Sequence, residues 1–353
     1  MQFAILNDTH CGIRNSSDIF IEYQRRFYEE IFFPYCLDNN IKKVVHLGDA
    51  FEHRRFVNFK ALHSYRRSFL DRLREHGMTM DIIPGNHDIY YKNTLEVCAL
   101  KELMGHYTDC VTIHMEPTVV EYDGLKVGLV PWICQDNEKQ IEHFLDTCDA
   151  PIVGGHFELA GFEVMKGITL HDGHSANNLR RFETVLSGHF HTKSNQGNIH
   201  YLGAQMEFFW NDAGDDKFFH IFDTEDRSLT PVRNPLTLYE KVLYDDTKVN
   251  YNEFDTDIFD GKFVKVIVIN KTDQFTFDRF LDRIGNRKVH DLKIQENLQE
   301  WVGDNVADSS LEVEDTSELL RGYVDNVETI LDKDRLKNEL IELMTEAETF
   351  EVV

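Results

Sequence analysis

The sequence lacks any run of about 18 consecutive apolar residues, so we expect no membrane-spanning helix. Its first residues, MQFAILNDTHCG, contain neither the basic segment nor the long apolar segment of a secretory signal peptide. None of the six cysteines belongs to a CxxC pair, which argues against a disulfide framework or a zinc site and indicates thiols in a reducing cytoplasm. Basic residues are also scarce: 37 against 62 acidic residues give a net charge of −25, which argues against a general binder of polyanions.

The length of 353 residues fits two domains better than one, with roughly 150 residues per domain as a guide. The charge is distributed unevenly along the chain. Residues 304–353 hold 15 acidic and 4 basic residues, whereas residues 54–74 hold seven basic residues and one acidic residue. This basic stripe is either the solvated outer face of a helix or a nucleic-acid contact. If it binds nucleic acid, the candidate residues are Arg54, Arg55, Arg66 and Arg67.

Eight short apolar runs in the first 235 residues predict buried strands, because each is followed by Gly, Asn, Asp or Pro and many are β-branched. They cover residues 3–6, 43–47, 80–83, 125–130, 151–154, 184–187, 199–202 and 218–222. Helical patterns lie between them, so an α/β domain is expected. One helix is predicted over about 58–76, with Asn58 as its N-cap and Gly77 beyond its end.

A second unit is expected to begin near Leu236. Strands are predicted over 262–270 and 288–295, with a helix over 274–285 between them. Residues 303–318 are acidic and typical of a linker, and 333–348 form an amphipathic helical pattern that suits either core packing or docking to a partner. The predicted domains are therefore 1–235, 236–302 and 303–353.

Clusters of metal-ligating residues directly follow five of the apolar runs. The clusters are Asp8-Thr-His10, Gly48-Asp49, Gly85-Asn86-His87-Asp88, Gly154-Gly155-His156 and Gly188-His189-Phe-His191. Because the carboxyl ends of strands in an open α/β sheet line one crevice, we expect these clusters to meet in space. The glycines allow sharp turns and leave room at the site.

These residue types suit a centre of two divalent metal ions, since manganese, iron and zinc accept imidazole, carboxylate and carbonyl oxygen together. Each cluster alone also has a purely structural interpretation, as a turn, a cap or tight packing. GHxH is the strongest single motif, because its two histidines lie on the same face of an extended segment. The occurrence of all five clusters in this order, each at a strand end, favours a functional site.

The series DxH, GD, GNHD, GGH and GHxH resembles the calcineurin-like metallophosphoesterase superfamily over about residues 1–205. The early DTHCG, the GDAF segment and the HFEL that follows GGH are similar to the SbcD-type (Mre-eleven-type) DNA-repair nuclease subunit. The compact length and acidic tail look most like the version carried by T-even-type phages, a recombination endonuclease subunit. This resemblance implies a four-layer α/β/β/α core, in which a β-sandwich is flanked by helices, with a small α/β capping domain and a C-terminal helical tail.

The resemblance also implies roles for single residues. Asp8, His10 and His191 would hold the first ion; Asn86, His156 and His189 would hold the second; and Asp49 would bridge the two. His87 would act on the transition state or protonate the leaving oxygen, and Asp88 would orient His87. Cellular members often place a histidine three residues after the bridging aspartate, where this chain has Glu52, followed by His53. The roles of Glu52 and His53 are therefore left open.

The activity implied is that of a two-metal DNA nuclease, a 3′-to-5′ exonuclease on duplex ends and an endonuclease on single strands. Mn²⁺ is the expected cofactor, with Mg²⁺ as the alternative. The implied partners are DNA, a second copy of the chain and an SbcC-type SMC-like ATPase bound by the C-terminal helix, in the cytoplasm (that of the bacterial host if the chain is phage-encoded). The rival hypotheses are a metallophosphatase or phosphodiesterase acting on small molecules or phosphoproteins, and a non-catalytic scaffold, against which the intact ligand set argues.

Overall fold

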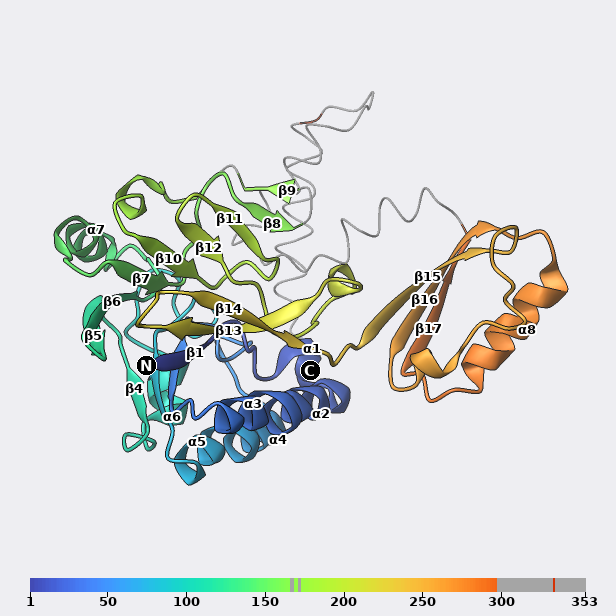
Figure 1. Cartoon of the computed structure of the whole chain (residues 1–353), viewed down its shortest axis with the longest axis horizontal. Helices are drawn as coiled ribbons and strands as arrows, with labels where there is room; N and C mark the ends of the chain where they lie inside the picture. The colour runs from blue at the N-terminus through green and yellow to red at the C-terminus, as the bar shows by residue number, and fades with distance from the viewer. Residues whose placement is uncertain (166–167, 171–172, 297–332, 334–353) are drawn as a thin grey trace. The chain divides into compact units, whose positions relative to one another are not determined.

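The computed structural model describes residues 1–165, 168–170, 173–296 and 333 (Figure 1). The described residues other than Lys333 belong to one compact unit. The expected acidic linker and all of the expected C-terminal helix except Lys333 lie outside the described residues. Within the described part of the chain, no helix is both long enough and apolar enough to cross a membrane. All six cysteines are buried, and none is joined to another in a disulfide.

The first of two six-stranded sheets contains the N-terminal strand at its centre. Its strands, in spatial order, are β14 (Leu229–Asn234), β13 (Lys217–Asp223), β1 (Gln2–Leu6), β2 (Lys43–His46), β3 (Thr79–Ile82) and β4 (Val111–Ile113). Strands β1 to β4 are parallel; β13 pairs antiparallel with β1, and β14 pairs antiparallel with β13. The apolar runs predicted four of these strands. They missed β4, which has only three residues, and β14, which is a polar edge strand.

The second six-stranded sheet repeats this design. Its strands, in spatial order, are β11 (Ser194–Gln196), β12 (Ile199–Tyr201), β10 (Thr184–Ser187), β7 (Ile152–Gly155), β6 (Leu125–Val130) and β5 (Thr118–Tyr122). The central four are parallel, and β5 and β11 are antiparallel edge strands. The four central strands are again those that the apolar runs predicted. A short hairpin of β8 (Glu163–Met165) and β9 (Ile168–Thr169) follows β7 in the chain.

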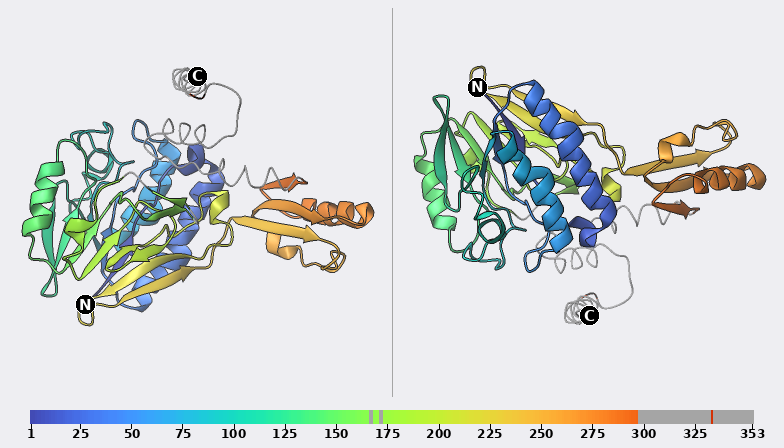
Figure 2. Two further views of the ribbon diagram at one scale, coloured as in Figure 1. Left: turned by 90° about the horizontal axis from the view of Figure 1, so that it is seen from above. Right: turned by 90° about the horizontal axis from the view of Figure 1, so that it is seen from below.

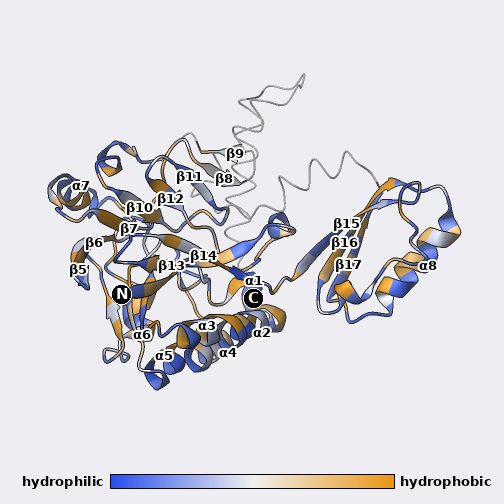
Figure 3. Ribbon diagram, in the orientation of Figure 1, coloured by the Kyte–Doolittle hydropathy of each residue, from blue (hydrophilic) through white to orange (hydrophobic). Residues whose placement is uncertain are grey.

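The two sheets pack face to face. One buried cluster joins Phe3 and Ile5 of β1 with Val127 and Leu129 of β6, and with Ile152 of β7. Because successive side chains of a strand point to opposite faces, the alternate residues of β1, such as Ala4 and Leu6, belong to a second cluster beneath the helices. In Figure 3 the inner strands are largely coloured as hydrophobic, and the helices show both colours.

Two long helices cover the first sheet and lie side by side (Figure 2). Each consists of two α-helical parts joined by a π-helical segment. The first comprises α2 (Asp18–Arg26), η1 (Phe27–Phe32) and α3 (Phe33–Asp38), and the second α4 (Phe59–Tyr65), η2 (Arg66–Leu70) and α5 (Asp71–Glu75). The second confirms the helix predicted over 58–76: the Asn58 side chain accepts hydrogen bonds from the peptide N–H groups of Lys60 and Ala61 at its start, and Gly77 follows with a φ of 61°.

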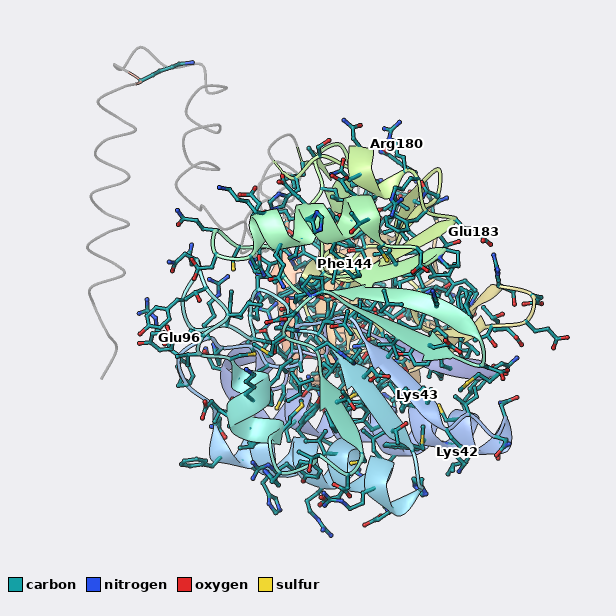
Figure 4. The ribbon with its side chains drawn as sticks, turned by 90° about the vertical axis from the view of Figure 1, so that its left-hand side faces the viewer. Lys42, Lys43, Glu96, Phe144, Arg180 and Glu183 are labelled. Carbon is teal, nitrogen blue, oxygen red and sulfur yellow. The ribbon has the colours of Figure 1, made fainter. Side chains whose placement is uncertain are left out.

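Helix α7 (Glu138–Thr147) covers the second sheet. Its Phe144 lies on the side facing the strands (Figure 4), where a Cβ atom on Gly128 of β6 would lie 3.3 Å from the Phe144 ring. The layers therefore run helix, sheet, sheet, helix, which confirms the predicted α/β/β/α core. Shorter helical elements complete it: α1 (Ile13–Ser16), α6 (Ala99–Met104), η3 (Asn177–Leu179) and η4 (Trp210–Asp212).

A third sheet follows in the chain. It contains the parallel strands β15 (Tyr239–Asp245), β16 (Phe263–Asn270) and β17 (Asp291–Gln295), with α8 (Gln274–Gly285) between the last two and η5 (Asp257–Phe259) before β16. The helix was predicted with these bounds and β16 with nearly these bounds. Strand β15 was not predicted. This sheet has its own buried core, which includes Tyr244, Val266 and Phe280.

Glu207 ties the segment before η4 to the start of β15. Its carboxylate accepts hydrogen bonds from the peptide N–H groups of Leu238, at 2.5 Å, and Tyr239, at 2.9 Å. The residue is 1% exposed, and this burial raises the pKa of the Glu207 carboxyl to about 7 although the two backbone bonds oppose the shift.

The raised pKa predicts a pH-dependent contribution of Glu207 to stability. Between the ordinary pKa of a glutamate and about 7, the folded chain binds this proton and the unfolded chain does not, so the free energy of unfolding falls as the pH rises. From pH 4.5 to 7.5, wild type should lose about 3 kcal/mol more than Glu207→Gln. Urea unfolding in the presence of a chelator measures the difference. The exposed Glu225→Gln serves as control, and parallel curves for wild type and Glu207→Gln would contradict the assignment.

Candidate metal centre

The structure brings the five clusters together at the carboxyl ends of strands from both large sheets. Asp8 and His10 follow β1, Asp49 follows β2, and Asn86 follows β3 in the first sheet; His156 follows β7, and His189 and His191 follow β10 in the second. The site therefore lies where the strand ends of the two packed sheets meet. The two sheets hold it from opposite sides, and each supplies part of the two ligand groups described next.

The first ligand group contains Asp8, His10 and His191, whose ligand atoms lie within 4.8 Å of one another. The Nε2 atoms of the two histidines are 3.1 Å apart, and each is 3.8 Å from Oδ1 of Asp8. His10 and Asp8 are buried. Three donor atoms thus converge on one point, as a metal ion requires.

The second ligand group contains Asp49, His156 and His189 within the same limit. Oδ1 of Asn86 joins them, 3.1 Å from Nε2 of His156 and 3.2 Å from Nδ1 of His189. Oδ2 of Asp49 lies 3.2 Å from Nε2 of His156 and 3.9 Å from Nε2 of His10 in the first group. The Asp49 carboxylate therefore stands between the two groups.

The local backbone is strained at these positions. Asp8, His10, Asp49 and His189 all have a positive φ, between 44° and 85°, a region that residues other than glycine seldom adopt. At Gly48, with a φ of 92°, a Cβ atom would lie 2.6 Å from Nδ1 of His156. The glycine of the GD motif is thus required for the close approach of the second sheet's histidine.

The His87 ring lies between the two groups, and it forms a third potential ligand group with His10 and Asp49, whose ligand atoms lie within 4.8 Å of one another. Its peptide N–H donates to Oδ1 of Asp49 at 2.9 Å, and its ring centroid lies 4.8 Å from that of His10. Nδ1 of His87 lies 2.7 Å from the carbonyl oxygen of Glu52. This carbonyl therefore orients the ring.

Asp88, which was expected to orient His87, contacts the backbone of the neighbouring loops. Its carboxylate is fully buried and accepts hydrogen bonds from four peptide N–H groups, those of Asp49, Ala50, Phe51 and Gly85, at 2.8 to 3.3 Å. Asp88 thus fixes the backbone that carries Asp49. Burial and the neighbouring Asp49 charge raise the pKa of Asp88 to about 6, against the effect of the backbone bonds.

Two glutamates at the edge of the site were not identified as functional from the sequence. Oε2 of Glu52 lies 2.7 Å from Nδ1 of His10, and Oε1 of Glu158 lies 3.5 Å from Nε2 of His189. Burial opposes their ionisation, but the neighbouring imidazoles outweigh it, and the pKa of each is lowered: Glu52 by His10 and Glu158 by His189. His53, the other residue left open, stacks on Phe56 with ring centroids 4.2 Å apart.

The site has an excess of buried negative charge. Burial alone lowers the pKa of a histidine, yet Glu52, Asp49 and Asp8 together raise the pKa of His10 to about 10. Asp49 and Asp8 likewise raise the pKa of His156 to about 9. The same negative charge that stabilises the protonated imidazoles would also stabilise bound cations. The imidazole, carboxylate and amide oxygen donors suit manganese, iron or zinc.

The structure separates the four candidate DNA-binding arginines. Arg54 and Arg55 lie on the loop that follows Asp49, and Arg55 is exposed. Nη2 of Arg66 donates to the carbonyl of Leu103 at 2.9 Å, and Arg67 pairs with Asp71 at 3.3 Å. The other basic residues of the stripe also face carboxylates: Lys60 faces Asp18, Arg72 faces Glu75, and Arg74 faces Asp109.

No family model matches the chain. A curated relative, exonuclease subunit 1 of Enterobacteria phage T4, is 29% identical over 337 residues, which cover 95% of each chain. Among solved structures, an archaeal phosphodiesterase is 16% identical with a TM-score of 0.35 and covers 66% of this chain and all of its own. A protein of Thermus thermophilus is 13% identical with a TM-score of 0.40 and covers 66% of this chain and 98% of its own.

Because both TM-scores lie below 0.5, the assignment rests on the phage relative and on the site itself. The relative matches along nearly its full length, and the five clusters stand in the order and geometry of a dinuclear phosphoesterase centre. The chain is a hydrolytic enzyme of the metallophosphoesterase kind, and it is similar over 95% of its length to the phage exonuclease subunit.

Proposed function

We propose that the chain is the nuclease subunit of a complex for recombination and double-strand-break repair. It cleaves DNA as a 3′-to-5′ exonuclease on duplex ends and as an endonuclease on single strands. The observation that carries the proposal is the convergence of two ligand groups around Asp49 in a chain that is similar over its length to a phage exonuclease subunit.

In this proposal Asp8, His10 and His191 hold one divalent ion. Asn86, His156 and His189 would hold the other, and Asp49 lies between the two groups. When bound, two such ions would polarise a phosphoryl group and lower the pKa of water towards neutrality. We expect Mn²⁺ as the ion, with Mg²⁺ as the alternative.

Besides the ions, His87 is the side chain proposed to act directly on the phosphoryl group. The Glu52 carbonyl can only accept a hydrogen bond, so Nδ1 of His87 carries a proton and donates it to that carbonyl. It is then Nε2 that gains or loses a proton. A protonated Nε2 stabilises negative charge on the phosphoryl oxygens or gives its proton to the leaving oxygen. Asp88 acts indirectly, by holding the backbone of Asp49 in place.

The proposed partners are DNA, a second copy of the chain and an SMC-like ATPase of the SbcC type. The name of the phage relative, a subunit, supports a partner in general terms. Phe59 of α4 is 83% exposed and Val97, just before α6, is 38% exposed, which supports a homodimer through this region. The ATPase would bind the C-terminal residues, and the complex would act in the cytoplasm.

A nuclease assay tests the proposed function. End-labelled duplex and single-stranded DNA are incubated with the protein and Mn²⁺ or Mg²⁺, with and without the ATPase. The expected result is metal-dependent release of nucleotides from duplex ends and internal cleavage of single strands. Hydrolysis of bis(p-nitrophenyl) phosphate without any cleavage of DNA would instead favour the phosphatase or small-molecule phosphodiesterase.

Replacement of His87 should separate chemistry from metal binding. His87→Ala should still bind two ions, because His87 is outside the proposed ligand set. Its phosphodiesterase activity should fall by roughly two to three orders of magnitude, the scale of losing one electrostatic stabiliser. Metal content and hydrolysis of bis(p-nitrophenyl) phosphate are measured on the same preparation. Loss of one ion from this variant would show that His87 is a ligand.

Two arginines of the basic stripe, Arg55 and Arg67, should contribute differently to DNA binding. Arg55→Gln should weaken duplex binding and reduce the salt slope by about 0.9, because one phosphate contact is lost. Arg67→Gln, with the same change of charge, should have a smaller effect, because Arg67 already faces Asp71. Fluorescence anisotropy over a salt series measures both slopes. A reduced slope for Arg67→Gln alone would place the DNA on the helix instead.

A further inference from the structure

Three histidines of the proposed metal centre have a second contact, made by the ring nitrogen that faces away from the other ligands. His156 turns Nε2 towards the ligand group, and its Nδ1 lies 2.7 Å from the carbonyl oxygen of Leu47. His10 turns Nε2 towards the first group and Nδ1 towards Glu52. His189 is reversed, with Nδ1 towards Asn86 and Nε2 towards Glu158. Each ligand group therefore contains one histidine that is backed by a carboxylate.

The charge of the proposed centre also indicates a role for Glu52 and Glu158. The proposed ligands include only two carboxylates, those of Asp8 and Asp49, against the four positive charges of two divalent ions. Glu52 and Glu158 bring two more negative charges to the edge of the site. Their side chains are only 16% and 19% exposed, so solvent screens them weakly. Both contacts are ion-pair contacts, and Nδ1 of His10 lies outside hydrogen-bond geometry, so the carboxylates act mainly through charge. An outer carboxylate of this kind favours the ring orientation that faces it and increases the basicity of a metal-ligating histidine.

We propose that Glu52 and Glu158 are positioning residues of the metal centre, one for each ion. Glu52 sets His10 for the ion held with Asp8 and His191, and Glu158 sets His189 for the ion held with Asn86 and His156. This inference rests on the proposed dimetal centre and adds the residues that give each of the two sites its own affinity. It also gives Glu52 a role at the position where cellular relatives often have a histidine.

Glu52 acts at two points through two different groups. Its side chain contacts His10, whereas its backbone carbonyl contacts Nδ1 of His87. A change of the side chain alone therefore alters the ion site and leaves the support of His87 in place. Glu52→Gln keeps the size and removes only the charge, and Glu52→Asp keeps the charge but shortens the reach to His10.

The test measures metal binding directly. Metal-free full-length protein is titrated with Mn²⁺ by calorimetry, and Mn²⁺-soaked crystals are examined by anomalous scattering at each site. Glu52→Gln should weaken one of the two sites about 10- to 100-fold and deplete the ion beside His10, and Glu158→Gln should do the same beside His189. Glu52→Asp should recover part of the loss. Glu142→Gln, on the exposed side of α7, has the same change of charge and should bind as wild type.

Thermal melts of the metal-free variants establish that each is folded. If wild type binds two ions and both glutamine variants bind them with wild-type affinity at both sites, the inference is overturned and the proposed function stands. Equal depletion of both ions in each variant would also overturn it, because the effect would then be one of total charge. If wild type binds no Mn²⁺ at these residues, the proposed dimetal centre itself fails.

Discussion

The site depends on one buried carboxylate that binds no ligand itself. Asp88 gathers the peptide N–H groups of Gly85, Asp49, Ala50 and Phe51, and so joins the loop after β3 to the loop after β2. Four donors to one acidic group offset part of the cost of its burial, which an isolated carboxylate could not tolerate. Because the same short loops carry Asp49, Asn86 and His87, this single group fixes their relative positions before any ion binds.

The loop after β1 is joined to the same framework by backbone bonds. The peptide N–H groups of Asp8, His10 and Cys11 donate to the carbonyls of Gly48, Asp49 and Ala50, at 2.8 to 3.0 Å. These bonds hold Asp8 and His10 in left-handed conformations that each cost about 1–3 kcal/mol. A rigid network of this kind keeps the acidic side chains close together. On an unsupported loop, the repulsion between their charges would move them apart. The structure thus maintains a ligand arrangement that is unfavourable without cations.

The sequence predicted the parts of this structure that follow from local pattern. Short apolar runs that end in glycine and polar residues revealed the central strands, and the expected convergence at strand ends brought Asp8, Asp49 and Asn86 towards His156. Strands β4, β14 and β15 were missed because they are short, polar or at a sheet edge. The contacts of Glu52 with His10 and of Glu158 with His189 join residues about 30 to 40 positions apart, and no local pattern marks them. The sequence of the basic stripe at 54–74 also did not predict that most of its basic residues face carboxylates.

The two π-helical segments have a consequence for how the chain can vary. Tyr28 lies in η1 and Phe69 in η2, and their rings stack across the helix pair with centroids 4.6 Å apart. A π-helical turn contains about one residue more than an α-helical turn. Deleting that extra residue from either segment would therefore restore a continuous α-helix and leave the parts before and after it in register with the first sheet. Each extra residue is thus accommodated locally, where the two helices contact each other through Tyr28 and Phe69.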